Sequence, residues 1–252
     1  MAKKRCYYEA EWVPEGVYHV YNSAVQPNLL FTERQHGIYF LKLLRDRVAS
    51  FAEVFAYALI PNHYHLGLRL KSEAALEEAI LSKRLGKRTV NERKWLTGVV
   101  TFNRLIGDYF ATVFAMYANY FNPRVGRRGT LLNQTLRRIR VREDLISRRL
   151  VMYIHTNEVK HGMRATYHDV GFRSSLWYYT SGRDVSWLAT DLALDRFGGL
   201  GRMLAAHETY VTKYGTTISR FDEHLYFAPL DGADEEAPYL EFLEDAPPPP
   251  YT

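Results

Sequence analysis

Apolar and polar residues follow strand spacing in some parts of the chain and helical spacing in others. Residues 16–21 form a short aromatic and β-branched run that predicts a first strand, whereas residues 33–52 carry apolar positions at helical spacing. Residues 55–70 predict two extended pieces that meet at Pro61, because proline cannot donate a hydrogen bond to a strand ladder. Residues 71–97 are polar and rich in Lys and Glu, which predicts a helical excursion.

A longer amphipathic helix is predicted over residues 99–121. Asn122 and Pro123 are expected to end it, and residues 136–141 then predict a strand. One helical stripe contains Val99, Phe102, Leu105, Ile106, Tyr109, Phe110, Val113, Phe114 and Tyr117. The irregular alternation of helices and strands indicates an α+β fold, with an antiparallel sheet flanked by helices.

Two histidines interrupt the apolar strand that follows Pro61. Because side chains alternate along a strand, His63 and His65 face one side together with Gly67 and Arg69, and the intervening Tyr and Leu residues face the other. One face of this strand is therefore apolar, and the other carries groups able to do chemistry.

A second polar pair is predicted on the helix over residues 143–157, which Gly162 is expected to follow as a stop signal. At about 100° per residue, Leu150, Tyr153 and Asn157 fall on one arc of this helix, so that a phenol and an amide share its buried face. The alternative is that Tyr153 only packs in the core and that Asn157 only caps the helix.

Composition describes a folded protein with an uneven charge. The chain has 252 residues, 47% of them hydrophobic, and a formal net charge of +5. Nine arginines lie within residues 124–149, whereas residues 221–252 hold nine acidic residues and no Lys or Arg. This asymmetry favours a surface that binds polyanions, with an acidic tail; the alternative is an ordinary solvated face.

Cysteine usage and hydropathy indicate a cytoplasmic protein. The single cysteine, Cys6, has no partner for an internal disulfide, no apolar run is long enough for a membrane span, and the N-terminus lacks the apolar core of a signal peptide. We expect a core over residues 1–182, a helical extension over residues 183–228, and an acidic, proline-rich tail over residues 229–252. The extension either contacts DNA or shields the sheet.

Several short segments together carry a family resemblance. His63-Tyr64-His65 matches the histidine-hydrophobic-histidine pattern of HUH single-strand nucleases. The segments YHVYN, PNHYHL, FNRL, GRRGTL, RRIRV and YIHTNEVKHGM occur in the order found in REP-associated tyrosine transposases. The chain therefore resembles the insertion-sequence-type tyrosine transposases, and that subfamily in particular, over roughly residues 16–180.

The resemblance implies a ferredoxin-like core and a metal-dependent reaction on single-stranded DNA. His63 and His65 match the ligands of a divalent metal, Mg²⁺ or Mn²⁺, and Asn157 matches the position of a third, oxygen ligand. Tyr153 matches the nucleophile, which attacks phosphorus to give a covalent 5′-phosphotyrosine. A free phenol has a pKa near 10, so a nearby cation or base is needed; the metal is the first candidate, and His155 and Lys160 are weaker ones.

The basic stretch is the predicted DNA-binding surface, because guanidinium groups bind phosphates irrespective of base sequence. Its candidate residues are Arg124, Arg127, Arg128, Arg137, Arg138 and Arg140. Arg137 and Arg138 must point to opposite faces of a strand, and we favour Arg127, Arg128 and either Arg138 or Arg140.

The expected partner is single-stranded or hairpin DNA, and the protein is expected to be a monomer or homodimer, with the site assembled within one chain or between two. Two alternatives stay open. The chain could be a catalytically silent protein that binds hairpin DNA as a repressor or architectural factor. It could also be an unrelated metal phosphodiesterase in which water attacks.

Overall fold

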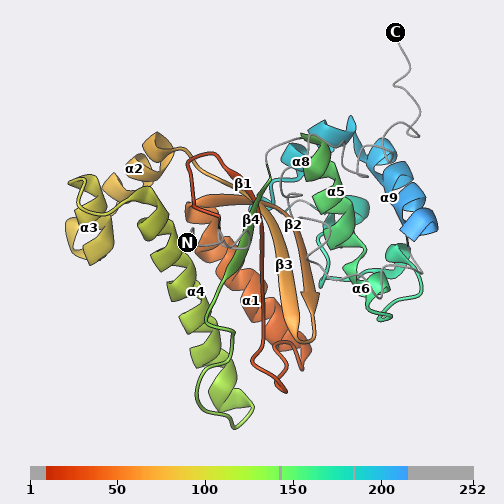
Figure 1. Cartoon of the computed structure of the whole chain (residues 1–252), viewed down its shortest axis with the longest axis horizontal. Coiled ribbons are helices and arrows are strands. Elements are labelled where there is room, and N and C mark those ends of the chain that lie inside the picture. Colours follow the sequence, from red (N-terminus) through yellow and green to blue (C-terminus); the bar gives the residue numbers. More distant parts are fainter. Residues whose placement is uncertain (1–9, 142–143, 184, 215–252) are drawn as a thin grey trace, which may run out of the picture.

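The structure is a computed structural model, which describes residues 10–141, 144–183 and 185–214. In this part of the chain four strands form one antiparallel sheet in the spatial order β2-β3-β1-β4 (Figure 1). The strands are β1 Val17–Ser23, β2 Ala52–Ile60, β3 His63–Leu70 and β4 Arg137–Val141. The predicted α+β fold with an antiparallel sheet is confirmed.

Helices cover both faces of this sheet (Figure 1). Helices α1 and α4 lie on one face, and α5, α8 and α9 lie on the other. The helices of the described residues are α1 Arg34–Asp46, α2 Glu73–Leu81, α3 Val90–Leu96, α4 Phe102–Arg124, α5 Asp144–His155, α6 Asn157–Lys160, α7 Leu176–Ser181, α8 Thr190–Phe197 and α9 Leu200–Tyr214, with short 3-10 turns at Val48–Ser50, Leu85–Lys87 and Tyr167–Asp169. The order β1-α1-β2-β3-α4-β4, with α2 and α3 inserted, is the ferredoxin-like β-α-β-β-α-β arrangement.

The core between the sheet and the α1/α4 layer is built from the apolar face of β3. The ring of Tyr64 lies 4.9 Å from that of Phe40 in α1 and 5.6 Å from that of Phe114 in α4. Leu66 and Leu68, on the same face of the strand, are fully buried. The alternation predicted from the sequence therefore assigns this face to packing and leaves His63 and His65 on the other.

The long helix differs at both ends from its prediction. Val99 is 70% exposed and precedes α4, which begins after Thr101, whose side chain accepts a hydrogen bond from the backbone N–H of Arg104. At the other end α4 continues through Pro123 to Arg124. A proline in the last turn removes only one hydrogen bond, and the N–H of Val125 still reaches the carbonyl of Phe121.

The helix predicted over residues 33–52 is shorter than expected. Helix α1 ends at Asp46, a 3-10 turn follows, and β2 already begins at Ala52. The apolar residues Val48 and Phe51 are buried, as the helical spacing required, but in a turn that redirects the chain into the sheet.

Both edges of the sheet are contacted by other parts of the chain. The backbone N–H of Leu59 in β2 donates to the carbonyl of Arg173, at 2.8 Å, and that of Ala189 donates to the carbonyl of Val54, also at 2.8 Å. At the opposite edge, the N–H of Ala10 donates to the carbonyl of Arg138 in β4, at 3.2 Å. These contacts occupy hydrogen-bonding groups that an open edge would leave to water.

Helices α8 and α9, from the predicted extension, pack on the α5 side of the sheet (Figure 1). Buried His207 of α9 lies with its Nε2 3.0 Å from Nδ1 of His155 in α5, and Nε2 of His155 lies 2.8 Å from Oγ of Ser175. The last part of the extension and the acidic tail over residues 229–252 lie outside the described residues. Within the ranges that the structure describes, no helix is long and apolar enough to cross a membrane.

Candidate active site

The two histidines of β3 lie under helix α5. His65 is fully buried, and its ring centroid is 5.0 Å from that of His63, with the two planes nearly perpendicular at 89°. Strand β1 places His19 and Tyr21 on the same face, since the register sets Tyr21 opposite His65. Three imidazoles and a phenol therefore line one patch of the sheet.

Tyr153 of α5 points onto this patch. It is 3% exposed, and its ring centroid lies 5.3 Å from that of His65 and 5.7 Å from that of His19, edge-on to both. The sequence predicted that Tyr153 lies on the buried face of its helix, and this is confirmed. The fold thus brings His65 and Tyr153, which are about 90 positions apart in the chain, into contact.

Burial keeps the histidines of the site neutral. It lowers the pKa of His63 to about 3, with smaller contributions from His161 and Lys160, and holds the pKa of His65 well below its ordinary value. A neutral imidazole has one nitrogen with a free lone pair, which is the form that binds a metal.

The hydrogen bond made by His63 determines which nitrogen carries that lone pair. Its Nδ1 lies 2.7 Å from Oδ1 of Asn62, an acceptor, so that Nδ1 carries the proton and Nε2 the lone pair. Nε2 of His63 is buried and has no hydrogen-bond partner among the described residues, and the same is true of Oδ1 of Asn157. An orphaned buried acceptor costs free energy, and a cation is one species that would satisfy it.

Imidazole nitrogen and amide oxygen are donor types that a divalent metal accepts, although no charged ligand is among them. Within the described part of the chain, no group of three or more His, Cys, Asp or Glu side chains could hold a metal ion. A metal here would rely on His63, His65 and the amide oxygen of Asn157, a mixed nitrogen and oxygen set that leaves positions open.

Asn157 is held differently from its prediction. Helix α5 ends at His155, and Asn157 is the first residue of the short helix α6, because Thr156 leaves helical geometry at φ −92° and ψ 3°. The amide nitrogen of Asn157 still donates to the carbonyl of Tyr153, at 3.2 Å. The side chain thus stays one turn from the phenol across a break in the helix.

Lys160 supplies a cation close to the phenol. Its Nζ donates to Oη of Tyr153 at 3.4 Å and lies 4.7 Å from the centre of the ring. An ammonium group in this position stabilises a negative charge on the phenolic oxygen. His155, the other candidate from the sequence, faces His207 and Ser175 instead.

Comparison with known proteins gave one match. No protein-family model and no curated protein matches the chain. A solved structure, described as a REP-associated tyrosine transposase bound to a REP hairpin, is 17% identical with a TM-score of 0.46, covering 74% of this chain and 96% of that one. Similarity of this extent does not establish membership of that family.

The six candidate arginines do not lie on one surface. Arg137 pairs with Tyr21 and so lies on the histidine face, its guanidinium 5.9 Å from the Tyr21 ring, whereas Arg138 and Arg140 pair with Val20 and Tyr18 of the opposite face. The register of β4, which the sequence did not supply, therefore makes Arg137 the strand arginine that shares the face of the site.

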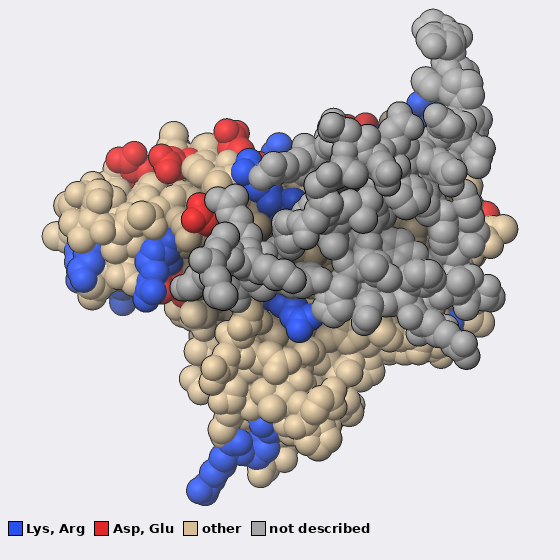
Figure 2. Space-filling view, in the orientation of Figure 1, with Lys and Arg blue, Asp and Glu red and all other residues tan. Residues whose placement is uncertain are grey.

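The remaining three arginines lie at the end of α4, where Figure 2 shows a cluster of basic side chains. Arg124 stacks on Tyr120, with its guanidinium carbon 3.8 Å from the ring centre. Arg127 holds the turn by donating to Oδ1 of Asn122 and to the carbonyl of Thr130. Arg128 is exposed.

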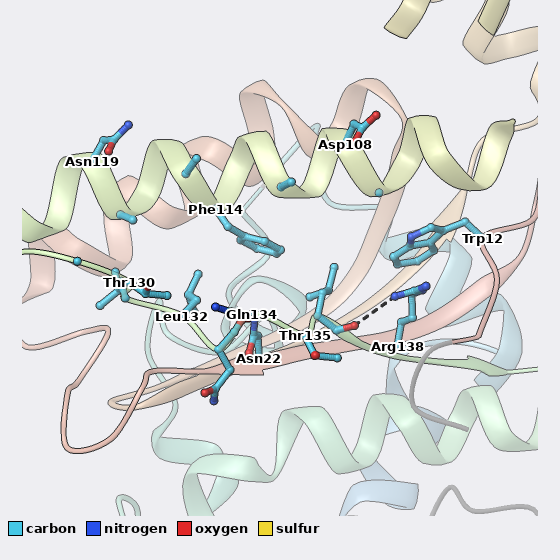
Figure 3. A pocket seen from close by; sticks show the side chains of 18 of the residues that line it. Trp12, Asn22, Asp108, Phe114, Asn119, Thr130, Leu132, Gln134, Thr135 and Arg138 are labelled. Carbon is cyan, nitrogen blue, oxygen red and sulfur yellow. Dashed lines mark hydrogen bonds between the residues drawn. The ribbon is translucent and has the colours of Figure 1, made fainter. Parts of the chain in front are cut away.

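A groove of about 780 Å³ lies on the other side of the sheet, between α4 and residues 129–138 (Figure 3). Trp12 and Arg138 lie at one end of it, Asn119 and Thr130 at the other, and Phe114 points into the space between. It contains neither the histidine pair nor Tyr153. His19, His65 and Tyr153 are buried, so the chemistry of these side chains is inferred from the contacts above.

Sequence reasoning did not select His19 or Tyr21 as site residues. The signal was present in YHVYN, where an imidazole and a phenol two residues apart must face the same way on a strand, as in His63-Tyr64-His65. Only strand pairing shows that this face is also the face of His65.

Proposed function

We propose that this protein is a metal-dependent single-strand DNA endonuclease and strand transferase, an HUH tyrosine transposase that acts on hairpin-flanked sites. The supporting observation is the edge-on contact between Tyr153 and His65, 5.3 Å between ring centres, beside a second histidine whose buried Nε2 has no described hydrogen-bond partner. A nucleophile and a pair of metal-type donors can then act on one phosphodiester.

Each residue has a separate task in this proposal. His63, His65 and Asn157 would hold Mg²⁺ or Mn²⁺, which when bound supplies charge to polarise a phosphodiester oxygen. Tyr153 Oη forms a bond to phosphorus, and the bond from phosphorus to the 3′ oxygen breaks. The phenol loses its proton and the 3′ oxygen gains one, which leaves a 5′-phosphotyrosine and a free 3′ hydroxyl. Lys160 stabilises the phenolate because its ammonium group donates to Oη.

The bond energy retained in the phosphotyrosine lets a second DNA end take its place without ATP. A 3′ hydroxyl attacks the phosphorus, and the Tyr153 oxygen leaves and recovers a proton. No GxxxxGK[ST] phosphate-binding loop occurs in the sequence, and this chemistry does not need one.

DNA binding would use two basic regions. Arg137 lies on the face of the proposed site, and exposed Arg128 lies at the end of α4. Contacts of this kind position phosphates irrespective of sequence, and they make affinity depend on salt. Single-stranded or hairpin DNA is the proposed partner, for a monomer or homodimer acting in the cytoplasm.

One observation favours a second candidate function. Tyr153 is 3% exposed, so a phosphodiester can reach Oη only if the chain that covers it moves. A protein in which that movement never occurs would bind hairpin DNA as a silent repressor or architectural factor. The two functions differ in whether a covalent adduct forms.

The test is an adduct assay with labelled single-stranded DNA that carries a hairpin, incubated with the protein and Mn²⁺ and then resolved under denaturing conditions. Wild type is expected to give a protein-DNA adduct, and Tyr153→Phe is not. Tyr64→Phe is the matched control, because Tyr64 is equally buried, on the opposite face of β3, and should retain the adduct.

The outcomes separate the candidates. DNA binding without cleavage or adduct identifies the silent binder. Cleavage without adduct, unchanged in Tyr153→Phe, identifies attack by water and overturns the role of Tyr153. Loss of adduct in Tyr64→Phe as well would mean that the assay reports only on folding.

A further inference from the structure

His19 is the fully buried imidazole nearest to the proposed ligand His65. Nε2 of His19 lies 2.9 Å from Nδ1 of His65, and the rings are stacked at 5.1 Å with 20° between their planes. Strand pairing fixes this contact, since β1 and β3 are adjacent and His19 and His65 lie on the same face. Tyr21 stacks on the ring of His19, with 4.7 Å between the ring centroids and 22° between the planes.

Two ring nitrogens 2.9 Å apart share a single proton, and there are two ways to place it. If His19 donates from Nε2, then Nδ1 of His65 accepts, and the proton of neutral His65 sits on Nε2. If His65 donates from Nδ1, then its Nε2 carries the lone pair. Only the second arrangement allows Nε2 of His65 to bind a cation.

The neighbouring histidine already shows the second arrangement. Nδ1 of His63 faces Oδ1 of Asn62 at 2.7 Å, which directs the lone pair of His63 to Nε2. With His19 as acceptor, each histidine of β3 would donate a hydrogen bond from Nδ1 and would carry its lone pair on Nε2. Such outer partners set the tautomer and orientation of metal-binding histidines.

We infer that His19 is a positioning residue, which accepts the Nδ1–H of His65 and so presents Nε2 of His65 to the cation. This rests on the metal site of the proposed function. His19 does not itself act on DNA; it fixes the tautomer and ring plane of a ligand. It also contacts Tyr153 edge-on, at 5.7 Å between centroids, so one side chain aligns both halves of the site.

The test measures Mn²⁺ affinity by the loss of the free-ion electron paramagnetic resonance signal, with no DNA present. His19→Phe keeps a ring but removes the acceptor, and it should weaken Mn²⁺ binding by about 10- to 100-fold. His19→Gln restores an acceptor near the position of Nε2 and should recover most of the affinity. His36→Phe is the control, because His36 is fully buried in α1 on the other side of the sheet, and it should bind as wild type does.

A second measurement needs no variant and guards against misfolding of His19→Phe. In wild-type protein with excess Mg²⁺, nitrogen-15 shifts of the His65 ring should show a protonated Nδ1 and an unprotonated Nε2. A proton on Nε2 overturns the inference, as does His19→Phe binding Mn²⁺ like wild type, or a folded His19→Gln that recovers nothing. Failure of wild type to bind Mn²⁺ at all would instead refute the metal site, which keeps the two failures distinguishable.

Discussion

Gly67 is the position where one added carbon atom should disturb the proposed site most. It follows His65 by two residues on the same face of β3, opposite His19 in β1. A Cβ at this position would lie 2.6 Å from Cε2 and 3.0 Å from Cζ of Phe55, and 3.3 Å from Cδ1 of Ile154. Ile154 is the neighbour of Tyr153 in α5, so Gly67→Ala presses on the helix that carries the phenol.

The size of the effect follows from these distances. Carbon atoms pack at about 3.5–4.0 Å, so the Phe55 ring must retreat by about 1 Å. Phe55 is fully buried, and overpacking of this kind costs about 1–3 kcal/mol in the free energy of unfolding. At about 2–4 °C per kcal/mol for a chain of this size, the melting temperature should fall by several degrees. A displacement of about 1 Å at Tyr153 would slow adduct formation by about 10²-fold.

Gly107→Ala is the matched control for the backbone effect of losing a glycine. Gly107 lies within α4, and an added Cβ would meet nothing within 4 Å. Alanine should stabilise this helix by up to about 1 kcal/mol. Differential scanning calorimetry of both variants and the denaturing adduct assay provide the measurements. If Gly67→Ala melts at or above the temperature of Gly107→Ala, the close packing of Phe55 and Ile154 against Gly67 is wrong.

Three further predictions concern other parts of the molecule. Glu92 is fully buried and accepts a hydrogen bond from Tyr109 Oη at 2.8 Å. Glu92→Gln should therefore lower the free energy of unfolding, measured in urea, by about 1–3 kcal/mol, whereas Glu77→Gln, at an exposed position, should change it little. Arg128→Gln should reduce the slope of log K for DNA binding against log salt by about 1; an unchanged slope would show that Arg128 contacts no phosphate. Burial lowers the pKa of His207 from 6.5 to about 4, so the unfolded state takes up its proton first. The free energy of unfolding should therefore fall as pH drops from about 6.5 to about 4. His207→Gln should flatten the measured dependence of unfolding free energy on pH, and stability that rose over this range would contradict the assignment.

The sequence alone determined features that depend on local geometry. Alternation along β3 sorted His63 and His65 from the apolar Tyr64 and Leu66, because successive side chains on any strand must point to opposite faces. Helical spacing likewise identified Tyr153 as a buried residue of its helix. Both are periodicities of a single element, so they can be read without knowing its neighbours.

Element ends were less well determined, because they depend on what the chain packs against. Pro123 did not end α4, and Thr156 did break the helix that was expected to carry Asn157. Val99 has helical spacing but lies in solvent, before the cap at Thr101. Helix propensity is a property of each single residue, whereas capping hydrogen bonds and tertiary packing determine at which residue a helix ends.

The tertiary structure alone decided which faces meet. Strand order and register bring His19 against His65, and assign Arg137 to the histidine face and Arg138 to the other. A shift of one residue in the pairing of β1 with β4 would exchange those two arginines without altering any local pattern in the sequence. Pairing between strands far apart in the chain is set by the total packing of both faces of the sheet, and for that reason the site had to be assembled from the fold.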